Sequence, residues 1–101
     1  MVTMKARLLL KERRNLGDNA FADLVVWQVP ASVPGSVHIY KYRLAFVVDN
    51  VCVLRYDNEA GKGDHRHIGD EETAYRFTSP VTLFNDFMTD VARWRNEHRN
   101  P

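Results

Sequence analysis

Hydrophobic and polar positions alternate at the start of the chain. Between Met4 and Glu12, Ala6, Leu8 and Leu10 fall on one parity and Lys5, Arg7 and Lys11 on the other, a period of two that predicts a half-buried β-strand. The segment "FADLVVWQV", residues 21–29, is apolar on both parities and rich in β-branched and aromatic residues, which favours a strand inside a sheet. The prolines of "PASVPGS", residues 30–36, end that strand because proline cannot donate to a ladder.

A hairpin follows. Residues 37–48 and 51–57 meet across Asp49 and Asn50, two residue types that tolerate the positive φ of a tight turn. A two-residue loop makes Val48 face Val51, and the pairing can then be counted outward. On this count one face of the hairpin carries Tyr42, Leu44 and Phe46 together with Val53, Arg55 and Asp57.

The last third of the chain predicts a helix. "TAYRF", residues 73–77, can form a short final strand, and Ser79 followed by Pro80 is a helix N-cap with proline in the first turn. Three- and four-residue spacings place one apolar stripe on a C-terminal helix, made of Val81, Phe84, Phe87, Met88, Val91 and Trp94 or Arg95. The predicted fold class is α+β, an antiparallel sheet of four to five strands with a C-terminal amphipathic helix packed on one face.

Size and composition narrow the class of protein. With 101 residues, 45% hydrophobic and 27% charged, the chain is expected to fold as one domain, residues 1–101. Cys52 is the only cysteine, so an intrachain disulfide is excluded and a reducing, cytoplasmic setting is expected; Cys52 itself is expected to be a small buried side chain. No apolar segment has the length of a membrane span, and a formal net charge of +1 gives little global signal for nucleic-acid binding.

The stretch "YDNEAGKGDHRHIG", residues 56–69, concentrates polar chemistry and is expected to be a loop. In an extended segment His65 and His67 point to the same side. One neutral imidazole can take a proton from a ribose 2′-hydroxyl while a protonated partner gives one to the leaving 5′-oxygen. Lys62, Arg66 or Arg55 would neutralise the charge that develops on phosphorus, and this route requires no metal and no cofactor.

Other interpretations of the same stretch stay open. The two histidines can bind a metal together with oxygen ligands, for which the candidates are Asp57, Asp64 and Asp70. They can also be surface residues of a loop whose glycines only permit the path of the chain. "EAGKG" does not match a phosphate-binding loop, because neither Ser nor Thr follows the lysine and no helix is predicted to begin there. His38 and His98 carry weaker signals than His65 and His67.

Residues 41–72, "KYRLAFVVDNVCVLRYDNEAGKGDHRHIGDEE", and residues 75–94, "YRFTSPVTLFNDFMTDVARW", resemble the TumE-type toxins of bacterial and archaeal toxin-antitoxin modules. The matching positions are Tyr56, Asp57, Asn58, Gly61, Gly63, His65, Arg66 and His67. The resemblance implies a small cytosolic toxin that is neutralised by a helix-turn-helix antitoxin encoded by a neighbouring gene. Small toxins of this kind are often ribonucleases, and the outline of the fold looks similar to RelE-like toxins.

The leading hypothesis is a metal-independent endoribonuclease in which His65 and His67 act as acid and base and Asp57 orients one imidazole. Phosphate would be bound by Lys62, Arg66 and Arg55, and a base would stack on Tyr56 or Tyr42. Two alternatives remain: a non-enzymatic toxin that binds and blocks a cellular target, and metal-dependent phosphodiester or nucleotide chemistry at the same residues. RNA and the antitoxin are the expected partners, and self-association stays open.

Overall fold

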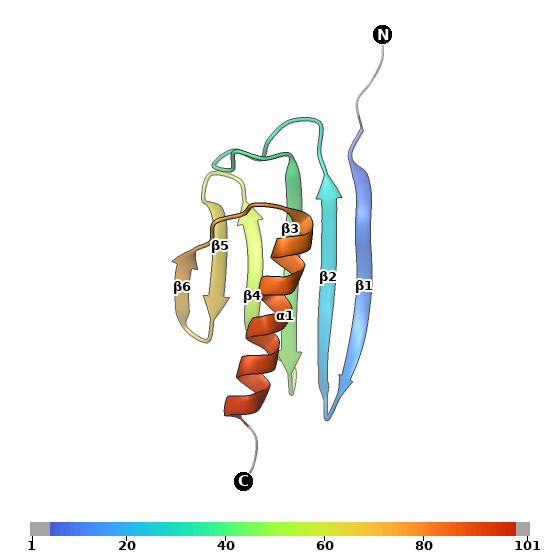
Figure 1. Cartoon of the computed structure of the whole chain (residues 1–101), viewed down its shortest axis with the longest axis vertical. Helices are drawn as coiled ribbons and strands as arrows, with labels where there is room; N and C mark the ends of the chain where they lie inside the picture. The colour runs from blue at the N-terminus through green and yellow to red at the C-terminus, as the bar shows by residue number, and fades with distance from the viewer. Residues whose placement is uncertain (1–4, 99–101) are drawn as a thin grey trace.

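A computed structural model describes residues 5–98 and contains one antiparallel sheet and one helix (Figure 1). The strands follow one another across the sheet in chain order, each beside the next. Their bounds are β1 Arg7–Gly17, β2 Ala20–Gln28, β3 Tyr40–Val48, β4 Val51–Glu59, β5 Gly63–Ile68 and β6 Glu71–Ala74, and the helix is α1 Pro80–Glu97. The predicted α+β class with a C-terminal helix is therefore confirmed.

The sheet has six strands, so the predicted four to five is wrong. The difference lies in the polar stretch, which is not a loop: β4 continues to Glu59, and β5 returns along it after a short turn. Gly61 and Gly63 both have positive φ at that turn. The last strand, β6, ends at Ala74, before most of the predicted "TAYRF" segment. Of the predicted first strand, Met4 lies outside the described residues.

The β3–β4 hairpin has the predicted two-residue turn, with φ of 50° at Asp49 and 66° at Asn50 and Val48 opposite Val51. The predicted face assignment is nevertheless wrong. A β-bulge lies at Val53, because Phe46 pairs with Leu54 while Val47 pairs with Cys52. One extra residue on β4 reverses the parity of everything beyond it.

Beyond the bulge, Tyr42, Leu44 and Phe46 share their face with Leu54 and Tyr56 instead of with Arg55 and Asp57. The bulge thus sends the charged residues of β4 to the other side of the sheet. Cys52, expected to be buried, is exposed.

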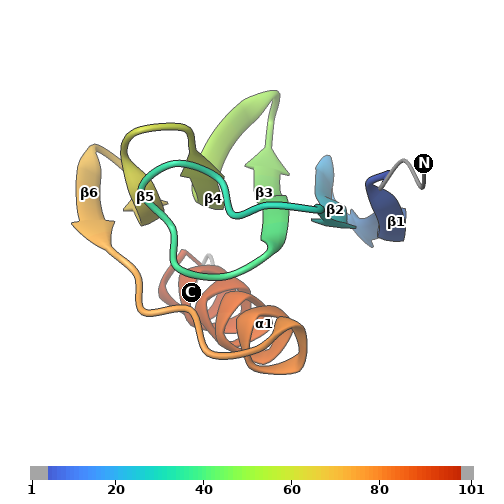
Figure 2. The ribbon, with the colours of Figure 1, turned by 90° about the horizontal axis from the view of Figure 1, so that it is seen from above.

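The helix lies against one face of the sheet, over β3 and β4 (Figures 1 and 2). Its N-cap is Ser79, whose side chain accepts a hydrogen bond from the backbone N–H of Thr82, with proline in the first turn as predicted. The fully buried core between helix and sheet includes Leu24, Leu44, Phe46, Leu54, Leu83 and Phe87. The predicted apolar stripe is wrong at its first position, because Val81 is 71% exposed and Leu83 lies in the core instead.

No helix in residues 5–98 combines the length and the apolar character needed to cross a membrane. The face of the sheet that lies away from α1, here called the open face, carries Arg55 and Asp57 of β4, placed there by the bulge, and His65 and His67 of β5, which pair with them.

Candidate functional site

Two neighbouring rows of side chains cross all six strands on the open face. Residues directly opposite each other in an antiparallel sheet project from the same face, so the strand pairings define each row. The first row consists of Lys11, Val25, Arg43, Asp57, His65 and Ala74. The second row consists of Arg13, Asp23, Ala45, Arg55, His67 and Glu72.

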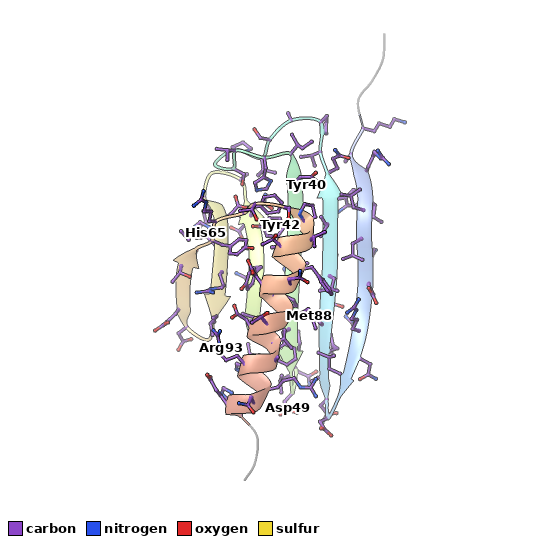
Figure 3. All side chains as sticks on the ribbon, viewed as in Figure 1. Tyr40, Tyr42, Asp49, His65, Met88 and Arg93 are labelled. Atoms are coloured by element: carbon purple, nitrogen blue, oxygen red, sulfur yellow. The ribbon has the colours of Figure 1, made fainter. Side chains whose placement is uncertain are left out.

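Where the rows reach β4, β5 and β6, five ionisable side chains come together, which we call the histidine cluster: Arg55, Asp57, His65, His67 and Glu72. Arg55 forms an ion pair with Asp57, with 2.9 Å between Nε and Oδ2. The carboxylate of Glu72 lies 3.7 Å from Nε2 of His65 and 3.9 Å from Nδ1 of His67. His65 lies at the β5 side of the sheet in Figure 3.

The ring of His65 is held in one tautomer. Its Nδ1 lies 3.1 Å from the backbone carbonyl oxygen of Gly63, and a carbonyl oxygen only accepts hydrogen bonds, so Nδ1 carries the proton. Nε2 of the neutral ring therefore has a free lone pair. With Glu72 Oε1 at 3.7 Å, a proton taken up at Nε2 would find an anionic partner.

The ring of His67 lies between two carboxylates and one guanidinium. Nε2 is 3.1 Å from Nη2 of Arg55, which can only donate, and 3.8 Å from Oδ1 of Asp57. Nε2 therefore accepts from Arg55, and the neutral ring carries its proton on Nδ1, on the side of Glu72. A protonated ring would have a carboxylate near each nitrogen and would have to displace Arg55 from Nε2. The two histidine side chains are 21% and 24% exposed, so both are accessible from the open face.

The other predicted site residues do not join this cluster. Tyr42 and Tyr56 are 3% and 1% exposed, on the face that the helix covers, so neither ring has a free surface on which a base could stack. Arg66 pairs with Tyr56 across β4 and β5 and also faces the helix. Lys62 lies exposed in the β4–β5 turn.

Tyr56 and Arg66 instead belong to a polar network that attaches the helix to the sheet. The hydroxyl of Tyr56 donates a short hydrogen bond to the carboxylate of Asp90, which is 7% exposed, and Arg66 Nη1 lies 3.4 Å from the same carboxylate. Burial is the main cause that raises the pKa of Tyr56 well above its usual range, and the hydrogen bond to Asp90 is the second. Its hydroxyl therefore stays protonated and serves as a donor.

A second cluster, which the sequence did not predict, surrounds Asp64 on the helix-covered side. Its carboxylate accepts hydrogen bonds from the hydroxyls of Ser36 and Tyr42, each at 2.6 Å, and from Nε2 of His38 at 2.7 Å. Burial alone would raise the pKa of Asp64, but these three donors outweigh it and lower the pKa below the usual value. We call this set the Asp64 latch, because it holds the β2–β3 connection onto β5.

His38 is a structural member of the latch. Its Nδ1 accepts from the backbone N–H of Tyr40 at 3.1 Å, so the proton is on Nε2, which donates to Asp64. Phe77 stacks on the ring with centroids 3.9 Å apart. Both ring nitrogens are occupied, which leaves no free atom for proton transfer to a substrate. No signal within a few residues of His38 indicated a partner 26 positions away.

The predicted metal ligands are divided between faces. Asp64 points toward the helix side, while His65 and His67 point to the open face. Asp70 is exposed in the turn between β5 and β6. Within residues 5–98, no group of three His, Cys, Asp or Glu side chains is arranged to hold a metal ion.

Comparison with known proteins identifies a family. The family model described as Toxin TumE matches residues 4–95, nearly the whole chain, and this range includes every residue of the histidine cluster and of the Asp64 latch. No curated protein and no solved structure matches. The match covers the sheet and almost all of the helix, so the chain belongs to the TumE toxin family and is the toxin component of a toxin-antitoxin system, with an antitoxin as its partner.

Proposed function

We propose that the protein is an endoribonuclease that acts in the cytoplasm on messenger or transfer RNA by histidine acid/base catalysis at the histidine cluster. The observation that carries the proposal is the arrangement of His65 and His67. They lie side by side on β5, accessible from the open face, each with a carboxylate within 4 Å and with Arg55 beside them. An acid and a base next to a cation are the groups that transesterification at phosphorus requires.

His65 is the base in this mechanism. The carbonyl of Gly63 holds the proton on Nδ1, so Nε2 is free to accept the proton of a ribose 2′-hydroxyl. The 2′-oxygen then attacks the adjacent phosphorus. Glu72, 3.7 Å from Nε2, stabilises the imidazolium that forms.

His67 is the acid. In the protonated ring, Asp57 and Glu72 lie within 4 Å of the two nitrogens, and the ring gives a proton to the 5′-oxygen as the bond from phosphorus to that oxygen breaks. This step requires Arg55, which donates to Nε2 in the structure, to turn from the ring to the phosphate. The guanidinium of Arg55, fixed by its ion pair with Asp57, stabilises the negative charge that develops on the phosphoryl oxygens. Lys62, in the β4–β5 turn that precedes β5, lies outside the histidine cluster and supplies a further positive charge that attracts phosphate.

Two residues of the cluster thus have positioning roles. Asp57 orients Arg55 and His67, and Glu72 orients both imidazoles, without touching the substrate. Buried Tyr42 and Tyr56 and partly exposed Arg66 support the sheet from the helix side and have no direct role in binding RNA.

The test is the fate of RNA after brief induction of the protein in growing cells. The wild-type chain is expected to produce discrete cleavage products, and the double variant His65→Ala/His67→Ala at matched expression is expected to produce none. His98→Ala is the matched control, because His98 lies exposed at the end of the helix, stacked on Trp94, and should cleave like wild type. Growth arrest with intact RNA would refute the proposal and favour a toxin that blocks a cellular target.

Purified protein separates the chemical alternatives. Cleavage of a defined RNA is expected to continue in EDTA, whereas a metal-dependent enzyme would lose activity and recover it with one divalent ion. The rate is expected to follow a bell-shaped pH profile, and His65→Ala should remove the limb on the acid side, where a base must be deprotonated. A flat profile would contradict the assignment of these two residues.

The proposal includes the kind of antitoxin: a helix-turn-helix protein encoded by a neighbouring gene. Co-expression of the two proteins from the native gene pair is expected to give one copurifying complex without RNase activity. Independent elution at micromolar concentration would show that the neighbouring protein is not the antitoxin.

A further inference from the structure

The open face contains a hollow away from the histidine cluster, between β1 and β3. Its volume is about 530 Å³. The lining residues are Lys11, Glu12, Arg13, Asp23, Leu24, Val25 and Arg43. None of them belongs to the acid/base chemistry described above.

Two of the lining cations are free to take a ligand. Within the described part of the chain, neither Lys11 nor Arg43 forms a hydrogen bond or an ion pair with any side chain, and both are exposed. Arg13, by contrast, is held by Asp23 through two hydrogen bonds of 2.7 and 2.9 Å. Lys11 and Arg43 are the direct neighbours of Val25 on either side, so an apolar floor separates two cations that form no ion pair. Asp57, opposite Arg43 on β4, pairs with Arg55 instead.

The hollow and the histidine cluster lie on one line. Lys11, Val25, Arg43, Asp57 and His65 form a single row, one residue from each successive strand. Adjacent strands are about 4.8 Å apart, so Lys11 is about 10 Å from Arg43, and Arg43 is about 10 Å from His65, measured between backbones. Long cationic side chains on this line can contact successive phosphates of one extended strand.

An aromatic ring borders the line. Trp27 is two residues from Val25 on β2 and pairs with Lys41 of β3, so it projects from the open face and is partly exposed. The rings of Tyr42 and Tyr56 are buried on the other face, which leaves Trp27 as a platform where an unpaired base can stack. A cationic groove beside an aromatic surface is the arrangement typical of single-stranded nucleic-acid binding.

We propose that this hollow is the binding subsite for the RNA backbone on one side of the scissile bond, with Lys11 and Arg43 contacting phosphates and Trp27 stacking a base. The substrate therefore crosses the strands at right angles, from β5 toward β1, and is single-stranded. This inference rests on the proposed ribonuclease function and extends it to substrate recognition. Duplex RNA does not fit as well, because its bases have no free face for Trp27.

Binding is measured in the non-cleaving background His65→Ala/His67→Ala, with a fluorescently labelled single-stranded RNA of mixed sequence. The test variant adds Lys11→Ala/Arg43→Ala. Its charge-matched control adds Arg14→Ala/Arg93→Ala, two arginines on the helix side of the sheet, where Arg14 lies over Phe84 and Arg93 contacts Asp90. Circular dichroism and thermal unfolding establish that every variant folds.

Counterion release sets the expected size of the effect. Each phosphate contact on a single strand contributes about 0.7 to the slope of log affinity against log salt. Loss of one contact therefore weakens binding about eightfold at roughly 50 mM salt and about threefold at roughly 200 mM. The variant with Lys11→Ala/Arg43→Ala is expected to lose both phosphate contacts, so its affinity depends less steeply on salt. The control with Arg14→Ala/Arg93→Ala is expected to bind like the non-cleaving parent. Trp27→Ala is expected to weaken binding about tenfold with an unchanged salt slope.

The kinetics of the cleavage-competent enzyme test the subsite independently of the binding measurement. In the active enzyme, Lys11→Ala/Arg43→Ala is expected to raise KM and leave kcat nearly unchanged, because these contacts are made equally in the ground and transition states. The subsite would be overturned, and the proposed function left standing, by one combination of results: the wild type cleaves RNA, and the test variant binds RNA with full affinity and an unchanged salt slope. RNA binding that depends on Lys11 and Arg43 without any cleavage would support the subsite and refute the proposed chemistry. A chain that neither binds nor cleaves RNA would overturn both.

Discussion

The Asp64 latch allows a quantitative test of what holds the β2–β3 connection in place. The perturbation is Asp64→Asn, which keeps the shape of the side chain and removes its charge. Three donors converge on the carboxylate, from Ser36, His38 and Tyr42, at 2.6 to 2.7 Å. The side chain is only 10% exposed, so water does not replace what the substitution removes.

The expected loss follows from the number of bonds. A hydrogen bond to a charged group stabilises a fold by about 1.5–3 kcal/mol and one between neutral groups by about 0.5–1.5 kcal/mol. The substitution therefore costs about 1 kcal/mol for each of the three bonds, or about 3 kcal/mol of the free energy of unfolding. A domain of this size has roughly 5–15 kcal/mol in total, so the loss is large.

The effect has a defined pH dependence. Because the pKa of Asp64 is lower in the folded state than its ordinary value of 3.8, the ionised latch contributes its full stability above that value. The contribution is lost as pH falls through the lower, folded-state pKa. Wild type and Asp64→Asn are thus expected to differ at neutral pH and to converge in acid.

Urea unfolding followed by circular dichroism, at neutral pH and at several acidic values, measures both expectations. Asp70→Asn is the control, because Asp70 is an exposed carboxylate in the next turn and makes no contact with the latch. A free energy of unfolding within about 0.5 kcal/mol of wild type at neutral pH would show that the three hydrogen bonds do not hold the connection. A difference between the two proteins that persists unchanged into acid would contradict the role of the charge.

Three further substitutions test single features of the fold by the same unfolding measurement. Gly63→Ala would bring a Cβ within 2.7 Å of a backbone oxygen at positive φ, while the Cβ of Gly61→Ala meets open space at a similar φ. The first substitution is expected to lower the free energy of unfolding by about 1–3 kcal/mol more than the second. Equal losses would exclude the clash. Ser79→Ala removes the N-cap hydrogen bond and is expected to cost about 1 kcal/mol; no loss would mean that the cap adds nothing to stability. Tyr56→Phe removes the donor that faces buried Asp90 and is expected to cost about 1–3 kcal/mol. A neutral result would show that Arg66 and Arg93 satisfy that carboxylate without Tyr56.

The sequence was a reliable guide where a few neighbouring residues determine the conformation. Asp49 and Asn50 specify a two-residue turn because both tolerate positive φ, and Ser79 with Pro80 specifies the start of the helix. The same reasoning placed His65 and His67 on one side of an extended segment, which they share in β5. These properties depend on residues that are neighbours in the sequence, so the packing of distant parts of the chain does not change them.

The sequence failed where one local event has consequences further along the chain. The bulge at Val53 has no distinctive residue, yet it moved Arg55 and Asp57 away from Tyr42 and onto the open face. Glycine and charge made residues 56–69 look like a loop, but pairing with β4 on one side and β6 on the other makes β5 a strand. Strand formation in such a polar segment depends on its neighbours more than on its own propensity.

The sequence by itself therefore determined the fold class, the hairpin, the helix and its cap, and the presence of two histidines on one side of a strand. Only the tertiary structure decided that Arg55, Asp57 and Glu72 surround these histidines on the open face, and that Asp64 and His38 meet on the other face. The physical reason is that hydrogen bonds and ion pairs between distant residues depend on strand register and chain path, and a register changes by whole residues when a single bulge is inserted.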